Sequence, residues 1–426
     1  MQKNTGSTDP FAPLASEILA VAPGRAHDLA RLRVLAQRAA PATVTVVGKY
    51  NHGKSRLLNE LMGSDVFAVA DRRETVRLSE HRHADVRWLD APGLDADVAE
   101  QDDSHAQEAT WLQADIRLFV HAAKEGELDA AERALLQALR DDQQRTRRQT
   151  LFVLTQVDQM ADEAQLERVS SAIATQAPGL TLHPVSSTRH RSGIEGGKKL
   201  LLEKSGIPAL QAWLRDVTAQ VPAARRHERA LLLDEIDQQL QQQQHSAQAQ
   251  LQALRQQQHQ QRQDFEQGLE AVLDKVHQDL LPVLEVEGDD PALVPDTAAD
   301  EFKLTAGKRE RARIHVAYSR ACIAIRAHLI KHGVEGLPAD QRTSVTSLDT
   351  VMVAVMGISI KYRADLRRRF CEPAGRAQMT QSFLHYYELS EDRQALLQAL
   401  ARADAALHAA TRAVDALEQL RTVELA

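Results

Sequence analysis

The fold is decided by the stretch GKYNHGKS, Gly48 to Ser55, which matches the pattern G-x-x-x-x-G-K-[ST] of a phosphate-binding loop. Such a match is informative when a buried strand precedes it and a helix follows it. The run TVTVV at Thr43–Val47 is rich in β-branched residues and predicts a buried parallel strand. The run RLLNELMG, which ends at Gly63, predicts a helix. We therefore interpret residues 48–55 as a P-loop between a strand and a helix.

The residue types in this loop suit the phosphates of a nucleotide. Glycines let the backbone approach a ligand closely, and the N–H groups at the start of the next helix point at the phosphates. We expect Lys54 to reach the β- and γ-phosphates and Ser55 to ligate Mg²⁺. The alternative is that Gly48 and Gly53 only form a tight turn. The expected phosphate-binding residues are Gly48, Asn51, His52, Gly53, Lys54, Ser55, Arg56 and, further along the chain, Gly93.

Three later segments end strand-like runs and add to this site, because ligands of open α/β sheets bind at the carboxyl ends of strands. In DAPG, of the form D-x-x-G, Asp90 is expected to hold Mg²⁺ and the Gly93 N–H to contact the γ-phosphate. TQVD ends the next run, and its Asp158 carboxylate can accept hydrogen bonds from N1–H and the N2 amino group of guanine, which favours GTP. VSS ends the fourth run, where the backbone can contact guanine O6. The expected guanine-binding residues are Thr155, Gln156, Asp158, Ser186 and Ser187.

The pattern of strands and helices divides the chain into three parts. Strand-like and helical runs alternate over 43–221, which predicts an α/β domain with a mostly parallel sheet and helices on both faces. Over 222–426 the strand-like runs largely vanish. Apolar residues there recur at helical spacing through a glutamine-rich run, so we expect an extended all-α bundle or stalk rather than a disordered tract. Residues 1–42 predict one or two helices that pack with this helical region.

The composition limits the class of protein. The chain has 426 residues and 43% hydrophobic residues, enough for two or three domains, and its net charge of −7 provides no general attraction to nucleic acid. Two cysteines, Cys322 and Cys371, lack metal-ligand spacing and suit a reducing cytosol. No apolar run approaches the roughly 20 residues that cross a bilayer, and the first residues lack the apolar core of a signal peptide. We expect a cytoplasmic protein, with peripheral membrane association as an open alternative.

The four segments, in this order and each at a strand end, resemble a GTPase domain of the translation-factor class. Within that class, GKYNHGKSRLLNELMG, DAPG and TQVD look most like bacterial Era-like and dynamin-like GTPases, over residues 43–221. The helical regions on either side resemble dynamin-like proteins only in layout. The resemblance implies GTP and GDP as ligands, Mg²⁺ as a cofactor, hydrolysis of GTP coupled to movement of a helical arm, and homodimers formed through the GTPase domains or the arm.

Three positions bear on how closely the chain follows this family. Gln156 stands where the family motif N-K-x-D or T-K-x-D has a lysine whose stem covers the base. Leu94 stands where small GTPases have a glutamine that orients the attacking water. Thr75 in RRETVRL is the only threonine between the P-loop and DAPG, so it is our candidate for the switch I residue that helps to bind Mg²⁺. The alternative for Thr75 is a plain solvent-facing loop residue.

Asn51 is the fourth residue of the P-loop, and the resemblance implies that an asparagine there helps to coordinate K⁺ beside the phosphates. Because Leu94 replaces the usual glutamine, we expect K⁺ and a second GTPase domain, docked face to face, to supply what catalysis otherwise lacks. The alternative is that Asn51 only hydrogen-bonds its own backbone within the turn, as asparagine often does.

Two other clusters favour a structural role. HRH at His81–His83 predicts a solvated turn in a short hairpin, because no carboxylate or cysteine completes a metal site there. VMVAVMGISI at Val351–Ile360 is followed by Arg367, Arg368 and Arg369, a pattern that would also suit contact with an anionic membrane. We favour a buried bundle segment, because the run is too short to span a bilayer and the arginine spacing suits a helix surface.

These observations favour a Mg²⁺-dependent GTPase whose arm tethers or remodels a membrane or binds an unidentified protein. One alternative, kept open by Leu94, is a scaffold that binds guanine nucleotides without appreciable hydrolysis. Another is a ribosome- or RNA-associated GTPase. The helical half has no basic patch with interleaved aromatic residues, so nucleic acid is not an expected partner.

Overall fold

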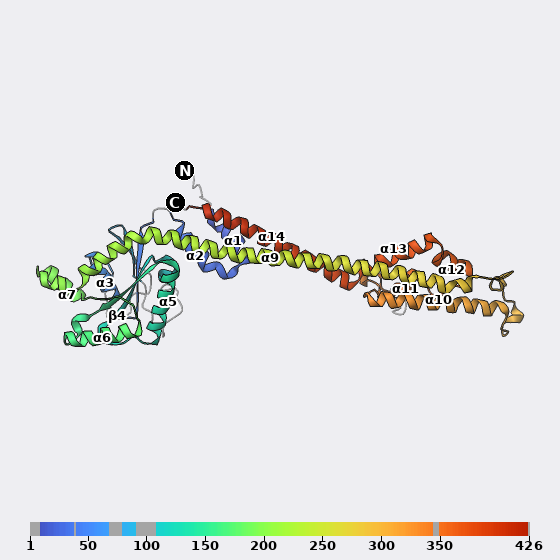
Figure 1. The fold of residues 1–426 in the computed structure, drawn as a ribbon, viewed down its shortest axis with the longest axis horizontal. Coiled ribbons are helices and arrows are strands. Elements are labelled where there is room, and N and C mark those ends of the chain that lie inside the picture. The colour runs from blue at the N-terminus through green and yellow to red at the C-terminus, as the bar shows by residue number, and fades with distance from the viewer. Residues whose placement is uncertain (1–8, 38–39, 68–78, 91–107, 344–348, 425–426) are drawn as a thin grey trace. The chain divides into compact units, whose positions relative to one another are not determined.

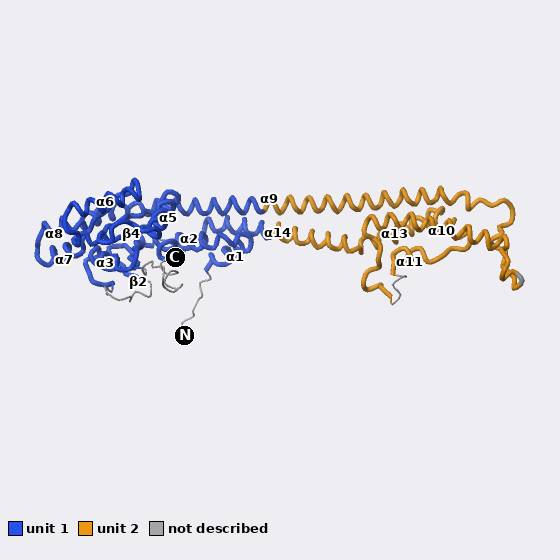
Figure 2. The backbone as a smooth tube through the Cα atoms, turned by 90° about the horizontal axis from the view of Figure 1, so that it is seen from below, with its two compact units in different colours: residues 1–243, 409–426 blue, residues 244–408 orange. Residues whose placement is uncertain are grey.

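The computed structural model describes residues 9–37, 40–67, 79–90, 108–343 and 349–424. It divides into two compact units, which Figure 2 distinguishes by colour. Unit 1 comprises residues 1–243 and 409–426, and unit 2 comprises residues 244–408. Two helices, α9 (Ile207–Leu284) and α14 (Glu391–Thr422), contribute residues to both units. Each unit has its own hydrophobic core, so each is described by itself.

Unit 1 contains a six-stranded sheet in the order β2-β3-β1-β4-β5-β6. Every neighbouring pair is parallel except β2 with β3, which form the hairpin that the sequence predicted around His81–His83. The registers pair Val46 with Asp90 and Ala122 with Thr155, so the carboxyl ends of these strands lie along one edge of the sheet. The strands are β1 Ala42–Val47, β2 Ser79–His83, β3 Val86–Asp90, β4 Ile116–Ala122, β5 Gln149–Thr155 and β6 Leu182–Pro184.

Alternate residues of the central strands pack into two cores, one on each face of the sheet. On one face Val46, Leu118 and Val153 pack with α3 and the start of α9 (Figure 1). On the other face Phe119 and Phe152 pack with α5 and α6. The predicted fold class, a mostly parallel sheet with helices on both faces, is confirmed. The helices here are α3 Lys54–Met62, α5 Ala130–Thr146, α6 Glu163–Gln176, α7 Ser187–Glu195 and α8 Lys199–Lys204.

The N-terminal helices of unit 1, α1 (Phe11–Val21) and α2 (Ala26–Leu35), pack against helical segments from far along the chain. Ile18 and Leu32 share a core with Ile236 of α9 and Leu417 of α14. Short helical turns at Pro23–Arg25, Glu108–Gln113, Ala123–Glu125 and Val157–Gln159 complete this unit.

One helix, α9, crosses the boundary that the sequence predicted between the α/β domain and the helical region. It joins the end of the α/β region to the glutamine-rich run in a single helix of 78 residues that runs through Pro222. Pro222 removes one backbone hydrogen bond, but Val217 and Val221 pack on the sheet just before it and Leu232 packs with α1 and α2 soon after it. The predicted domain boundary at 221–222 therefore falls inside a continuous helix, whereas unit 1 extends to Gln243.

Unit 2 is helical and has an aromatic core. Phe265 of α9 stacks on Tyr387 of α13, and Tyr318 of α10 donates hydrogen bonds to the carbonyl oxygens of Met356 and Gly357. The predicted all-α character of this region is confirmed. The helices are α10 Ala306–Lys331, α11 Val351–Met356, α12 Arg363–Phe370 and α13 Pro373–Leu389, with short turns at Pro291–Leu293, Ala298–Asp300 and Ala339–Gln341.

The run Val351–Ile360 contributes mostly to this core. Val351, Met352 and Met356 are buried, whereas Ile358 is 74% exposed. Arg369 donates a hydrogen bond to Met356 O, while the side chain of Arg368 pairs with Asp365 at the surface. None of the described helices is long and apolar enough to cross a bilayer.

Candidate functional site

The P-loop joins β1 to α3 at the carboxyl edge of the sheet. Gly48 has φ of 150°, and a Cβ there would lie 2.2 Å from Val120 O of the neighbouring strand. Gly53 has φ of 82°, a left-handed conformation that favours glycine, and caps the start of α3. Both glycines are therefore required by the backbone, and they make Lys54 and Ser55 the first two residues of the helix.

Lys54 is held inside the loop. Its side chain is buried, and its ammonium group donates hydrogen bonds to Gly48 O at 3.0 Å and Lys49 O at 2.7 Å. These contacts place a positive charge at the N-terminus of α3, where the helix dipole also stabilises negative charge. The position is suited to binding an anionic group above the loop.

Ser55 and Asp90 meet at the same edge. Ser55 Oγ donates a hydrogen bond to Asp90 Oδ2 at 2.5 Å, and the Asp90 side chain is only 2% exposed. Burial raises the pKa of the Asp90 carboxyl, against the opposing effects of the Ser55 hydrogen bond and the Lys54 charge. Among the described residues, the buried Oδ1 of Asp90 has no hydrogen-bond partner. A hydroxyl and a carboxylate with one open oxygen form a donor set that fits Mg²⁺.

The end of β5 is tied to the P-loop by two side chains. Thr155 Oγ1 donates a hydrogen bond to His52 O at 2.6 Å, and Gln156 Nε2 donates one to Asn51 O at 2.8 Å. Asn51 and Gln156 have φ of 59° and 60°, respectively. Gln156, where the family has lysine, therefore contacts the phosphate-binding loop directly. The side chain of Asn51 is exposed, so a role toward K⁺ stays a prediction.

Asp158 lies in a cavity beside these residues. Ser186 Oγ donates a hydrogen bond to Asp158 Oδ1 at 2.7 Å, and Ser186 Oγ itself accepts a hydrogen bond from the Arg189 N–H at the start of α7. One carboxylate oxygen is thus positioned by Ser186, and the carboxylate lines the cavity. The lining residues are Gly53, Arg56, Thr155, Gln156, Asp158, Gln159, Ser187 and Thr188. This set brings the expected phosphate-binding and guanine-binding residues together.

Three positions singled out from the sequence, Thr75, Gly93 and Leu94, lie outside the described residues. Their predicted roles in switch I, phosphate binding and water positioning stay predictions.

Sequence reasoning missed two contacts that support the loop from behind. Lys49 pairs with Asp129, which caps the N-terminus of α5. His52 points its ring at His121 and Glu132 in the interior. The sequence signal for the second contact was a histidine within the apolar strand run LFVHAA.

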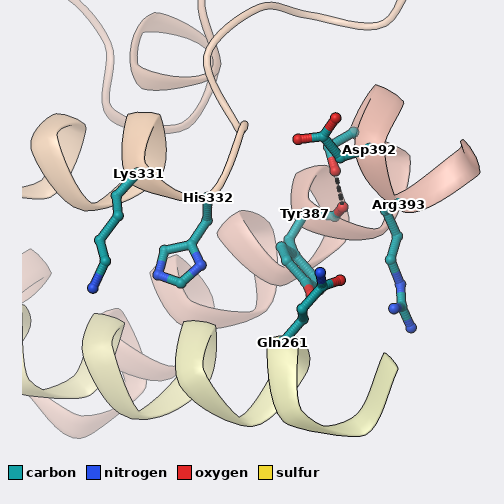
Figure 3. A pocket seen from close by; sticks show the side chains of 7 residues that line it. Gln261, Lys331, His332, Tyr387, Asp392 and Arg393 are labelled. Carbon is teal, nitrogen blue, oxygen red and sulfur yellow. Dashed lines mark hydrogen bonds between the residues drawn. The ribbon is translucent and has the colours of Figure 1, made fainter. Parts of the chain in front are cut away.

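Unit 2 contains a second pocket, shown in Figure 3, that is polar and of a different kind. Tyr387 and Arg393 lie on one side of it and Lys331 and His332 on the other. Arg393 is already paired with Glu388 at 3.0 Å. None of its lining residues belongs to the P-loop.

The P-loop, the Ser55–Asp90 pair and the Asp158 cavity at one sheet edge define a P-loop GTPase domain. Residues 43–156 match the family model described as 50S ribosome-binding GTPase. The chain is 28% identical over 152 residues to GTPase Era of Bordetella petrii, which covers 34% of this chain and 50% of Era. The match to Era thus spans half of that protein's length.

The chain belongs to the same family as the uncharacterized protein ACIAD1443 of Acinetobacter baylyi, with 52% identity over 380 residues, 89% of this chain and 91% of that protein. A solved structure of a bacterial dynamin pair, described as sensing and tethering membranes over a long range, is 14% identical and covers 97% of this chain and 80% of its own. Its TM-score is 0.36, too low to support a shared function.

Proposed function

We propose that the chain binds GTP with Mg²⁺ at the carboxyl edge of the unit 1 sheet and hydrolyses it slowly. The observation that carries this proposal is the buried Ser55–Asp90 pair at 2.5 Å, with Asp90 Oδ1 lacking a partner among the described residues. A buried carboxylate with an open oxygen is costly unless a cation or donor completes it. Its place at the start of the P-loop helix suits the cation that accompanies a nucleotide's phosphates.

Each residue of the site has a proposed role. Lys54 and the N–H groups of residues 51–56 bind the phosphates, and Ser55 and Asp90 hold Mg²⁺, which when bound neutralises the charge of the phosphate oxygens. Asp158, positioned by Ser186, accepts hydrogen bonds from guanine. Thr155 and Gln156 keep the P-loop against the end of β5. Thr75 is proposed to complete the cation site and Gly93 to contact the γ-phosphate.

We further propose that Asn51 coordinates K⁺ and that two GTPase domains dock across their nucleotides during turnover. Leu94 cannot orient the attacking water as a glutamine would. K⁺ and the second GTPase domain therefore position the water and supply the positive charge that catalysis needs. An arginine that supplies such a charge raises rates by about 10³–10⁵-fold, so a partial substitution by K⁺ is measurable.

Phosphate release from GTP tests hydrolysis. The wild-type chain is expected to turn over faster in K⁺ than in Na⁺, with a specific activity that rises with protein concentration. Asp90→Asn is expected to lower turnover by more than about 100-fold, since removing one transition-state contact costs about 10²–10³-fold. Asp141→Asn, on the exposed face of α5, is the matched control and is expected to have no effect.

If wild type and Asp90→Asn both bind GTP but show equally negligible turnover, the alternative is favoured. The chain would then be a scaffold that binds guanine nucleotides without appreciable hydrolysis. Turnover that is the same in K⁺ and Na⁺, and independent of protein concentration, would reject the K⁺ and docking mechanism.

We propose that the helical arm transmits the nucleotide state to a membrane surface or a protein partner. Unit 2 exposes large apolar side chains between α9 and α10, with Phe302 96% and Leu304 69% exposed. Cosedimentation of the intact chain with vesicles, compared between GTP and GDP, tests the membrane arm of this proposal. Vesicle binding by the wild type that is lost in Phe302→Ser would support contact with a membrane. If the chain does not cosediment with vesicles in GTP or in GDP, a protein partner remains as the proposed target of the arm.

A further inference from the structure

Behind the P-loop, three buried side chains with metal-ligating atoms converge on one point. His52 comes from the P-loop, His121 from the end of β4 and Glu132 from the first turn of α5. One ligating atom from each lies within 4.8 Å of the others, and no side chain of the three is more than 6% exposed. Among the described residues, no other such group was found.

The hydrogen bonds of His121 require a positive centre beside it. Its Nε2 lies 3.1 Å from Gly126 O, a carbonyl that can only accept, so Nε2 carries a proton. Its Nδ1 lies 2.8 Å from Glu132 Oε1. In a neutral imidazole that Nδ1 would turn a lone pair toward a carboxylate, which is repulsive. Either a proton or a metal ion must therefore lie between them.

The other hydrogen bonds of His121 and Glu132 resemble those that support metal ligands in proteins. A ligating histidine usually donates its other ring N–H to a carbonyl or carboxylate, as His121 does to Gly126 O. A ligating carboxylate is usually hydrogen-bonded too, and Glu132 Oε2 accepts from the Asp129 N–H at 3.2 Å. These contacts fix both side chains in place before any ion is present.

We propose that His52, His121 and Glu132 form a zinc site that is separate from the nucleotide's Mg²⁺ site. Two imidazoles and one carboxylate are ligands that Zn²⁺ prefers, whereas Mg²⁺ and Ca²⁺ prefer oxygen ligands alone. Zinc ligands at about 2.0–2.2 Å in tetrahedral geometry lie roughly 3.3 Å apart. The Glu132 oxygen lies 2.8 Å from His121 Nδ1 and 3.6 Å from His52 Nδ1, values on either side of that spacing.

His52 also contacts the backbone of β4. Its Nδ1 lies 3.3 Å from Val120 O, a carbonyl that can only accept, so this nitrogen carries a proton before an ion binds. Ligands of a metal ion must be deprotonated, so a bound zinc ion would displace this proton as well as the one between His121 and Glu132.

The site is connected to the nucleotide edge through the backbone of one residue. His52 O accepts the hydrogen bond from Thr155 Oγ1, and Gly53 and Lys54 follow in the loop. A bound zinc ion would tie the centre of the P-loop, at His52, to β4 and α5. We therefore expect zinc to raise the thermal stability of unit 1 without any nucleotide present.

Zinc titration of the intact chain tests the proposal. The chain is dialysed for a long period, because the ligands are buried, and its zinc affinity is measured by competition with a chromophoric chelator. No nucleotide or Mg²⁺ is added, so the outcome does not depend on the proposed GTPase function. We expect one tightly bound zinc ion per chain. His121→Gln and Glu132→Gln are expected to weaken it by more than about 100-fold, since losing supporting contacts alone costs about 10–100-fold.

His83→Ala, which removes an exposed histidine from β2, is the matched control and is expected to bind zinc like the wild type. Should both buried variants fail to fold, X-ray absorption of the zinc-loaded wild type is decisive, with nitrogen and oxygen ligands at about 2.0–2.2 Å expected. Binding that neither variant weakens, a sulfur ligand at about 2.3 Å, or no stoichiometric zinc at all would overturn the proposal. The last result would leave a proton between His121 and Glu132.

Discussion

The two ends of the unit 1 sheet both gather buried charges, but they treat them differently. At the carboxyl end, Lys54 donates hydrogen bonds to two backbone carbonyls, and Asp90 keeps one oxygen without a partner among the described residues. At the amino end, Arg31 pairs with Glu228 at 2.8 Å and with Asp115 at 3.3 Å. Asp90 at the carboxyl end keeps an oxygen that a ligand can complete, whereas these charges at the amino end pair with one another.

The paired charges at the amino end join the sheet to helices that are distant in sequence. Arg31 belongs to α2 and Glu228 to α9, while Asp115 precedes β4 and also accepts the Thr43 N–H at the start of β1. Further pairs of the network are Arg225–Asp115, Arg148–Glu228, Arg148–Asp142 and Arg117–Asp142. A change in the position of α9 against the sheet would therefore have to break contacts of this network.

Buried charges that serve a ligand and buried charges that hold the fold together differ in whether a partner within the chain compensates them. A buried ion that meets an opposite charge favours one packing arrangement of its neighbours. A buried ion that is left open raises the free energy of the ligand-free protein and lowers the cost of binding. The predictions that follow test whether the two ends can be damaged independently.

The largest effect is expected from Lys54→Ala at the carboxyl end. The β-phosphate charge would lose its main compensation, so binding of GDP and GTP should fall below detection, a loss of more than about 100-fold. Isothermal titration measures the affinity, and urea unfolding should show nearly unchanged stability. GDP binding within a few fold of wild type would show that the loop's N–H groups suffice and would weaken the contrast between the ends.

Glu228→Ala at the amino end should do the opposite. Removing Glu228 leaves Arg31 with its longer pair to Asp115 and Arg148 with its pair to Asp142, so two buried guanidinium groups lose part of their compensation. The free energy of unfolding should fall by up to about 3–5 kcal/mol. All three tryptophans, Trp88, Trp111 and Trp213, lie in unit 1, so urea unfolding followed by their fluorescence reports this unit.

The matched control is Glu235→Ala, two turns further along α9, whose pairs with Arg145 and Arg25 are partly exposed and should contribute about 0–1 kcal/mol. The folded fraction of Glu228→Ala should still bind GDP normally. A large loss of GDP affinity would show that the two ends are coupled even without turnover.

Asp158→Ala, at the carboxyl end, should remove the discrimination between guanine and adenine nucleotides without removing phosphate binding. The hydrogen bonds from guanine to the carboxylate would be lost, which should cost about 2–4 kcal/mol for GDP. The wild type should bind GDP and GTP but not ATP, and the variant should bind guanine and adenine nucleotides with similar weak affinity. Isothermal titration with all three nucleotides checks this, and equal affinity of the wild type for ATP would reject guanine recognition.

The smallest effect concerns pH and Asp142 at the amino end. Burial would raise the pKa of Asp142, but the charges of Arg148 and Arg117 lower it overall below its ordinary value of 3.8. A carboxyl whose pKa is lower in the folded chain stabilises the fold above about pH 4, and this contribution is lost as the pH falls through the folded-state pKa. Urea midpoints at pH 7 and pH 3 should therefore differ less in Asp142→Asn than in the wild type. An unchanged difference would contradict the assignment.

The sequence predicted which residues meet at the carboxyl edge of the sheet, because they form short patterns in fixed places. A glycine-rich loop between a strand and a helix, and aspartates directly after two other strands, are recognisable within ten residues. Parallel pairing then brings strand ends to one edge without further information. Ser55, Asp90, Thr155 and Asp158 were therefore placed before their distances were known.

Tertiary structure alone decided what lies behind and beneath that edge. His52 and Glu132 are joined only when β4 and α5 pack beside the P-loop, and Arg31 reaches Glu228 across 197 positions of sequence. It also kept α9 continuous through Pro222, because packing on both sides of the proline outweighs one missing hydrogen bond. Local patterns record propensity and burial, whereas the partner of a buried charge is set by which distant elements the fold brings together.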